Sequence, residues 1–243
     1  MKLKSLSAAI ALSLASSAAF SGSYNAEVSV NYVDLDGDAD AIGLVGELFF
    51  APVNTDGHPL EEAAFLEKAS NVELAYAIGS AGPVDTTVLV LGVNYYIPNT
   101  MFFAGASLSR ATVEVGSFDD SETDWGLTAG VTPIDGLLVT TEYSNDAGYD
   151  LNLHAKYVKA LKGETALNLE AFFEDSDFDN VYGISADYYL NKKASLGASI
   201  VSADETGYGI QGNVFLNNQF SIGAEYFTVD SANNVLLEAG YRF

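Results

Sequence analysis

The stretch YNAEVSVNY, residues 24–32, decides the fold because its side chains alternate between two kinds. The apolar or aromatic set is Tyr24, Ala26, Val28, Val30 and Tyr32, and the polar set is Asn25, Glu27, Ser29 and Asn31. Successive side chains of a β-strand point to opposite faces of the sheet, so this alternation predicts a strand with one apolar face. An amphipathic helix would instead repeat every three to four residues.

The same period of two returns at the other end of the chain, in VLLEAGYRF, residues 235–243. Similar segments occur at 41–51, 70–78, 86–97, 101–111, 124–132, 137–144, 150–158, 165–174, 181–190, 194–203, 207–216 and 219–228. Each is near the ~10 residues with which a tilted strand crosses a bilayer. The sequence therefore predicts an all-β fold, a transmembrane antiparallel up-and-down barrel of about 14 strands, with 12 or 16 as alternatives.

The connections between these segments fall into two alternating kinds. Short ones with few acids lie at 98–100, 133–136, 191–193 and 217–219, and longer acidic ones at 34–40, 113–124, 144–150, 174–180 and 203–206. Outer-membrane barrels have short periplasmic turns on one rim and longer loops on the other. The alternation predicts this asymmetry, with the short turns periplasmic.

One connection, residues 52–70, is long where a short turn is expected. Residues 59–68, PLEEAAFLEK, fit a short amphipathic helix. Two interpretations are open for this segment. The helix lies against the barrel rim, or it enters the barrel as a partial plug or constriction.

The first residues have the pattern of an export signal. Lys2 and Lys4 precede an apolar run over 6–20, and the small residues Ser21, Gly22 and Ser23 follow. This order predicts a signal peptide over residues 1–21, with cleavage between 19 and 23, and a barrel over 22–243. The predicted location is the outer membrane of a Gram-negative bacterium.

Composition excludes several classes of function. The net charge of −23, with only 10 Lys and Arg, argues against nucleic acid as a partner. The chain has no Cys and only two His, which leaves no convincing transition-metal set. His58 lies in the predicted periplasmic connection and His154 in mid-strand facing inward, so neither is placed to act as the base of a lipid-facing hydrolase or of a protease at the loop side. We therefore predict no enzyme activity, no cofactor and no metal centre.

Residues 34–40, DLDGDAD, place carboxylates at alternate positions, as the start of an EF-hand loop does. The distal Glu of that motif and its flanking helices are missing. Two interpretations remain open for these acids. They bind divalent cations weakly and bridge the loops to lipopolysaccharide, or they form a solvated surface.

If the apolar positions face lipid, the alternate positions face the barrel interior. The lumen-lining residues predicted in this way are Glu142, Asn152, His154, Lys156, Asn168, Glu170, Asp187, Gln211, Asn213, Glu225, Glu238 and Arg242. A mixed-charge, amide-rich interior suits a water-filled channel. The alternative is a closed barrel whose interior charges pair with one another.

The acidic connections predict an acidic outer mouth. Its residues are Asp34, Asp36, Asp38, Asp40, Asp119, Asp120, Glu122, Asp175, Asp177 and Asp179. Inside the predicted lumen, acids also outnumber Lys156 and Arg242. Both regions therefore predict a preference for cations over anions.

The run FFAPVNT, residues 49–55, continues into Pro59-Leu60 and AAFL, residues 63–66. With the alternating ends, it resembles the putative general bacterial porin family of gammaproteobacteria over nearly the whole mature chain. The resemblance implies passive diffusion of small hydrophilic solutes or ions and brings no catalytic residues. The rival class is a non-conducting structural or adhesive barrel.

The C-terminal residues Tyr241 and Phe243 resemble the signal by which the barrel assembly machinery recognises its clients. The partners expected are this machinery, outer-membrane lipid and lipopolysaccharide, and the permeating solutes.

Overall fold

The structure, a computed structural model, describes residues 22–37, 39–145, 151–175, 180–230 and 232–243. The predicted signal peptide, residues 1–21, lies outside the described residues. So do three acids of the predicted outer mouth, Asp38, Asp177 and Asp179.

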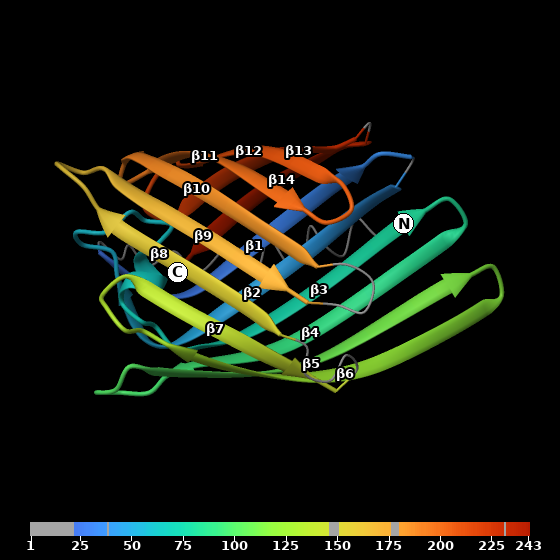
Figure 1. Ribbon diagram of the computed structural model, residues 1–243, viewed down its shortest axis with the longest axis horizontal. Coiled ribbons are helices and arrows are strands. Elements are labelled where there is room, and N and C mark those ends of the chain that lie inside the picture. The colour runs from blue at the N-terminus through green and yellow to red at the C-terminus, as the bar shows by residue number, and fades with distance from the viewer. Residues whose placement is uncertain (1–21, 38, 146–150, 176–179, 231) are drawn as a thin grey trace.

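Fourteen strands of the described residues form one closed antiparallel barrel (Figure 1). They are β1 (Ser23–Leu35), β2 (Ala39–Asn54), β3 (Asn71–Ala81), β4 (Val84–Tyr96), β5 (Phe102–Val115), β6 (Phe118–Val131), β7 (Leu137–Ser144), β8 (Asn152–Ala160), β9 (Ala166–Glu174), β10 (Val181–Asn191), β11 (Ala194–Ser202), β12 (Thr206–Phe215), β13 (Phe220–Val229) and β14 (Ala232–Arg242). Each strand pairs with its neighbours in sequence. The predicted barrel and its strand number are confirmed.

The two alternating stretches at the ends of the chain are partners in the sheet. β1 pairs with β14, with Glu27 opposite Arg242 and Tyr32 opposite Leu237. The carbonyl oxygen of Phe243 accepts hydrogen bonds from the backbone N–H groups of Asn25 and Ala26, at 2.9 Å each. This seam leaves neither terminal strand with an unpaired edge, which a barrel in lipid requires.

The outer face of the barrel is apolar. Large side chains on it are strongly exposed, including Leu196 at 60% on β11 and Ile210 at 64% on β12. Apolar surface of this extent is unfavourable in water and suits contact with lipid tails. The described residues contain no helix long and apolar enough to cross a membrane.

The prediction of a loop over residues 113–124 is wrong. β5 and β6 continue through this region, Val115 pairs with Phe118, and only Gly116 and Ser117 form the turn. Gly116 has φ +63°, a conformation that glycine adopts without the steric cost of a Cβ. Asp119, Asp120 and Glu122 therefore belong to β6, and they are exposed.

The predicted loop over residues 34–40 is likewise shorter than expected. Asp34 ends the pairing of β1 with β14 and lies directly opposite Asp40 of β2. Of the described acids in this stretch, only Asp36 falls between the two strands. A strand that continues beyond the membrane meets water on both faces. Polar side chains are compatible with such a strand, so these acids do not require a loop.

Strand length makes the barrel wall uneven. β2 has 16 residues and β5 and β6 have 14 each, whereas β7 has 8 and β8 and β9 have 9 each. Figure 1 shows the β3–β4 and β5–β6 hairpins reaching far to the right, at the end of the barrel opposite the helix α2 (Ala63–Leu66). The asymmetry between the two rims therefore comes from tall hairpins as well as from loops.

The connection between β2 and β3 enters the barrel instead of lying against its rim. Leu60 and Ala63 are 4% and 0% exposed, and side chains of β8, β10 and β14 all contact residues 60–62. Strands on different sides of a barrel meet one segment only in its interior. Residues 55–70 are called the plug below, and the rim interpretation is wrong.

Candidate channel and its plug

Glu62 fixes the plug to the barrel wall. Its carboxylate is 2% exposed and accepts a 2.7 Å hydrogen bond from the Tyr189 hydroxyl of β10. Lys156 Nζ of β8 lies 3.0 Å from Glu62 Oε2 and 2.8 Å from Glu170 Oε1 of β9. A buried carboxylate is tolerated when charged and hydrogen-bonded partners satisfy it, and here the wall supplies both.

Glu61, its neighbour, reaches the next strands around the barrel. Ser195 Oγ of β11 donates to Glu61 Oε2 at 3.0 Å, and Asn213 Nδ2 of β12 donates to Oε1 at 3.3 Å. Burial, together with the adjacent Glu62, raises the pKa of Glu61 from 4.5 to about 7. One of the two plug carboxylates therefore titrates near neutral pH.

The plug backbone is held on the opposite side by β14. Arg242 Nη1 donates to the Leu60 carbonyl oxygen at 2.6 Å, while Arg242 Nε donates to Glu27 Oε2 at 2.7 Å. The guanidinium carbon also lies 4.6 Å from the ring centre of Tyr24 and 4.5 Å from that of Phe215. Arg242 is 4% exposed, so these contacts are shielded from water.

An apolar cluster closes the space between the plug and β1 and β2. It contains Tyr24, Phe49, Val53 and Ala63, with the Tyr24 and Phe49 rings edge to face at 5.5 Å. A helix of four residues has little stability of its own. Packing against this cluster, and the anchors of Glu61 and Glu62, hold it in place.

A polar cavity of about 250 Å³ borders the plug, and eight predicted lumen residues line it. They are Lys156, Asn168, Glu170, Asp187, Gln211, Asn213, Glu225 and Glu238. A second cavity of about 320 Å³ also borders the plug, and Arg242 lines it together with Glu238. The predicted lumen residues that line these two cavities thus come from six strands, β8–β10 and β12–β14.

The other three predicted lumen residues lie further from the plug. His154 stacks on Phe172, with ring centres 5.5 Å apart, beside a third cavity. The Asn152 side chain accepts from the backbone N–H of Glu142 and donates to its carbonyl oxygen, so it extends the pairing of β7 and β8. The Glu142 carboxylate lies close to Gly126 of β6.

Sequence reasoning missed several residues of this region. Glu61, Glu62, Tyr189 and Ser195 line the first cavity, and Glu27 and Glu47 line the second. Glu27 could have been predicted to face the lumen, because it belongs to the polar set of β1. Glu61 and Glu62 carried no such signal, since the position of the plug depends on contacts with distant strands.

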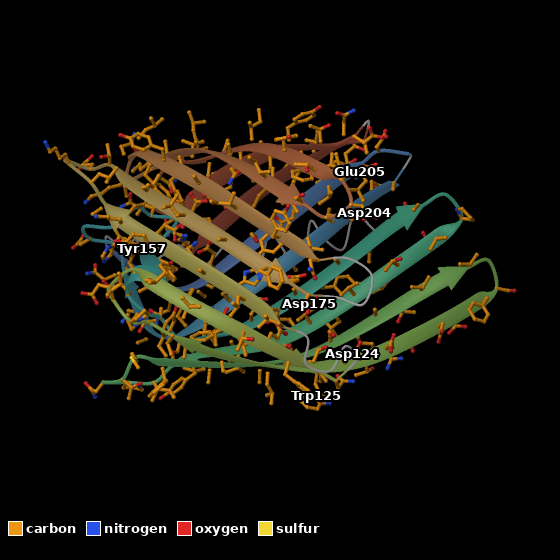
Figure 2. The ribbon with its side chains drawn as sticks, in the orientation of Figure 1. Asp124, Trp125, Tyr157, Asp175, Asp204 and Glu205 are labelled. Carbon is orange, nitrogen blue, oxygen red and sulfur yellow. The ribbon has the colours of Figure 1, made fainter. Side chains whose placement is uncertain are left out.

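Acids gather at the end of the barrel away from the plug. Figure 2 shows Asp175, Asp204 and Glu205 away from Tyr157, which lies near the plug end. Asp124 lies within β6, opposite Ser109 of β5 and short of the hairpin tip. Asp175 was predicted for the outer mouth, whereas Asp204 and Glu205 add to it. The described acids of this rim, together with Asp34, Asp36 and Asp40, carry negative charge into solvent.

A closed antiparallel barrel with an apolar outer face and a polar, charged interior defines the class of outer-membrane barrels. Within that class, the sequence profile of the family described as "Putative general bacterial porin" matches residues 1–153 and 124–243. The chain belongs to this family, and its location is the outer membrane.

One solved structure, that of an outer membrane protein, agrees with this assignment. The crystal structure of the Acinetobacter baumannii outer membrane protein Omp33 is 25% identical, with a TM-score of 0.76 over 91% of this chain and 99% of that one. The KdgM porin is 13% identical, with a TM-score of 0.46 over 89% of this chain and 99% of that one. No curated protein sequence matches the chain.

We expect plug docking to weaken as the pH rises from about 4.5 to about 7. The docked state holds a proton on Glu61 in this interval and a solvated glutamate does not, so docking takes up a proton. The stabilisation is complete below pH 4.5 and is lost by the time pH passes about 7. Single-channel recordings across this range should show longer or more frequent open periods at the higher pH.

The variant Glu61→Gln provides the control, because it keeps hydrogen-bonding atoms at this position and removes the titration. Its open probability should vary less between pH 4.5 and 7 than that of the wild type. An unchanged pH profile in this variant would contradict the role of Glu61.

Proposed function

We propose that the protein is a passive diffusion channel for small hydrophilic solutes that prefers cations, in a Gram-negative outer membrane. The single observation that carries this proposal is the charge of the cavity beside the plug. Six carboxylates line it, on Glu61, Glu62, Glu170, Asp187, Glu225 and Glu238, and Lys156 is the one cationic side chain among its lining residues. A pore lined in this way attracts cations and repels anions.

The acidic rim supports the same preference, because it raises the local concentration of cations at the entrance. The rim acids are exposed to solvent, so salt screens them more than it screens the interior charges. The Debye length falls from about 30 Å at 0.01 M to about 3 Å at 1 M salt. The contribution of the rim should therefore fade with salt while that of the cavity persists.

The reversal potential under a salt gradient tests this proposal. The full-length protein in a planar bilayer should give a reversal potential of the sign that cation flow requires. The preference should weaken, but keep its sign, as the mean salt concentration rises. Anion selectivity would refute the electrostatic argument.

The plug is the specific observation that favours the second candidate, a non-conducting structural or adhesive barrel. It lies inside the barrel and is anchored to β8, β10, β11, β12 and β14. Absence of any conductance, under conditions that should release the plug, would favour this candidate.

We further propose the partners that this location requires. Tyr241 and Phe243 at the end of β14 are the element that the barrel assembly machinery would recognise. The acids of the outer rim would meet lipopolysaccharide, with divalent cations between the two negative surfaces. Among the described residues, no group of three or more His, Cys, Asp or Glu is arranged to hold a metal ion, so such binding would be diffuse.

A further inference from the structure

A polar row crosses the inner face of the barrel beside the plug. Asp187 of β10 lies opposite Asn168 of β9 and Gly197 of β11, Gly197 lies opposite Gln211 of β12, and Gln211 lies opposite Glu225 of β13. All of these except Gly197 line the 250 Å³ cavity. Five adjacent strands thus present one polar level to the lumen.

Gly197 allows this row to form. A Cβ on Gly197 would lie 2.0 Å from Asp187 Oδ1, so the carboxylate occupies the space that any other residue would fill. Across Gly197, the same oxygen accepts from Gln211 Nε2 at 2.8 Å. Because Gly197 has no side chain, the Asp187 carboxylate can lie over β11 and reach Gln211 on the next strand.

The side-chain amides of the row donate their N–H groups to carboxylates. Asn168 Nδ2 lies 2.8 Å from Glu170 Oε1 and 3.1 Å from Asp187 Oδ2. This contact fixes the orientation of the amide, because a flipped group would place oxygen against two carboxylates. Asn168 is 2% exposed, and its carbonyl oxygen accepts no hydrogen bond from the described chain.

Two neighbouring amides repeat this arrangement. Gln211 and Asn213 donate to Asp187 and Glu61, and their carbonyl oxygens also accept no hydrogen bond from the described residues. Buried carbonyl groups without donors are uncommon in proteins. The cavity wall is therefore short of hydrogen-bond donors.

The wall is also short of positive charge. Lys156 is engaged by Glu62 and Glu170. Within the described part of the chain, no Lys, Arg or His forms an ion pair with Asp187 or Glu225. The three amide oxygens are themselves buried in the wall, so the groups of the row that a ligand in the cavity can reach are the carboxylates of Asp187 and Glu225. A ligand that carries positive charge on N–H donors would complement both carboxylates.

We propose that this polar row is a binding site for organic cations that carry N–H donors, namely a primary ammonium or a guanidinium group. An ammonium brings three donors and a guanidinium five, and both bind carboxylates well. A cavity of about 250 Å³ has room for such a head group together with water. The inference rests on the proposed channel function and names the solute class that the channel would favour.

Binding to the full-length protein in detergent, measured by calorimetry, tests this site without requiring conductance. Agmatine, which carries one group of each kind, should bind, whereas tetramethylammonium and K⁺, which have charge but no N–H donor, should bind at least about tenfold more weakly, as expected for lost hydrogen bonds to charged groups. Equal binding of agmatine and tetramethylammonium would overturn the proposal.

Two variants locate the binding. Asp187→Asn should weaken agmatine binding about tenfold or more, because a charged hydrogen bond is lost. Gly197→Ala should weaken it without any change in charge, because the added methyl displaces the Asp187 carboxylate. Glu164→Gln, which removes one exposed acid from the β8–β9 turn, is the matched control and should bind like the wild type.

Heat-modifiable gel migration checks that each variant is folded. If Gly197→Ala does not assemble, the comparison of agmatine with tetramethylammonium on the wild type still decides the proposal. Cation-selective conductance without agmatine binding would refute this site alone. Agmatine binding without conductance would refute the channel and leave the site.

Discussion

Lys156→Met is expected to release the plug and raise the conductance of the protein in planar bilayers. The substitution keeps an aliphatic side chain at this position and removes the cation that lies 3.0 Å from Glu62 Oε2. Glu62 is then a buried carboxylate whose described partner is the Tyr189 hydroxyl. Breaking a buried ion pair by removing one partner costs about 3–5 kcal/mol.

The effect on gating follows from that cost. Each 1.4 kcal/mol is a factor of ten in an equilibrium constant, so the ratio of docked to undocked plug should fall by about 100-fold or more. The barrel itself should remain intact, because its strand pairing does not involve this ion pair. Open events should become longer and more frequent in single-channel recordings, while heat-modifiable migration stays normal.

Two further variants test the assignment to Glu62. Lys159→Met removes the same charge from an exposed position on the same strand and should behave like the wild type. Adding Glu62→Gln to Lys156→Met removes the unpaired carboxylate and should restore most of the docking. The plug model would be wrong if Lys156→Met and Lys159→Met had the same conductance.

The barrel itself could be predicted from local pattern. Alternation over residues 24–32 and 235–243 predicts two strands with one apolar face, and a chain of such strands has few other ways to bury its backbone groups in lipid. The partnership of Glu27 with Arg242 was not predictable, because the closing register depends on the stagger of every strand between them.

The length of the strands that extend beyond the membrane could not be predicted from the sequence either. Acids at 119, 120 and 122 suggested a loop, yet they lie in β6 opposite residues of β5. A strand beyond the membrane meets water on both faces, so the apolar alternation that identifies a strand is lost there. Polar composition alone does not distinguish such a strand from a loop.

The interior site shows the same limit. Parity places Asn168, Asp187 and Glu225 on the inner face from sequence alone. Their alignment into one row depends on register, and the plug residues Glu61 and Glu62 reach partners 94 to 152 residues away. Contacts between residues so far apart in the sequence cannot be predicted from a local sequence pattern.

The inner and outer assignments are tested most directly by placing one charge on each side of the wall. Leu169 lies in β9 between Asn168 and Glu170, so its side chain faces outward, and it is 37% exposed. Arg on the lipid face near the middle of the bilayer costs about 2–4 kcal/mol. Leu169→Arg should therefore fold poorly into lipid vesicles, as measured by urea titration and heat-modifiable migration.

Ser185→Arg is the matched control, because Ser185 lies directly opposite Glu170 in the sheet and borders an interior cavity. An arginine there meets water and a neighbouring carboxylate instead of lipid tails, so the folding free energy should stay close to that of the wild type. Equal loss of folding in Leu169→Arg and Ser185→Arg would mean that the two faces of β9 and β10 are assigned wrongly. A loss confined to Leu169→Arg would establish which face of the barrel meets the membrane.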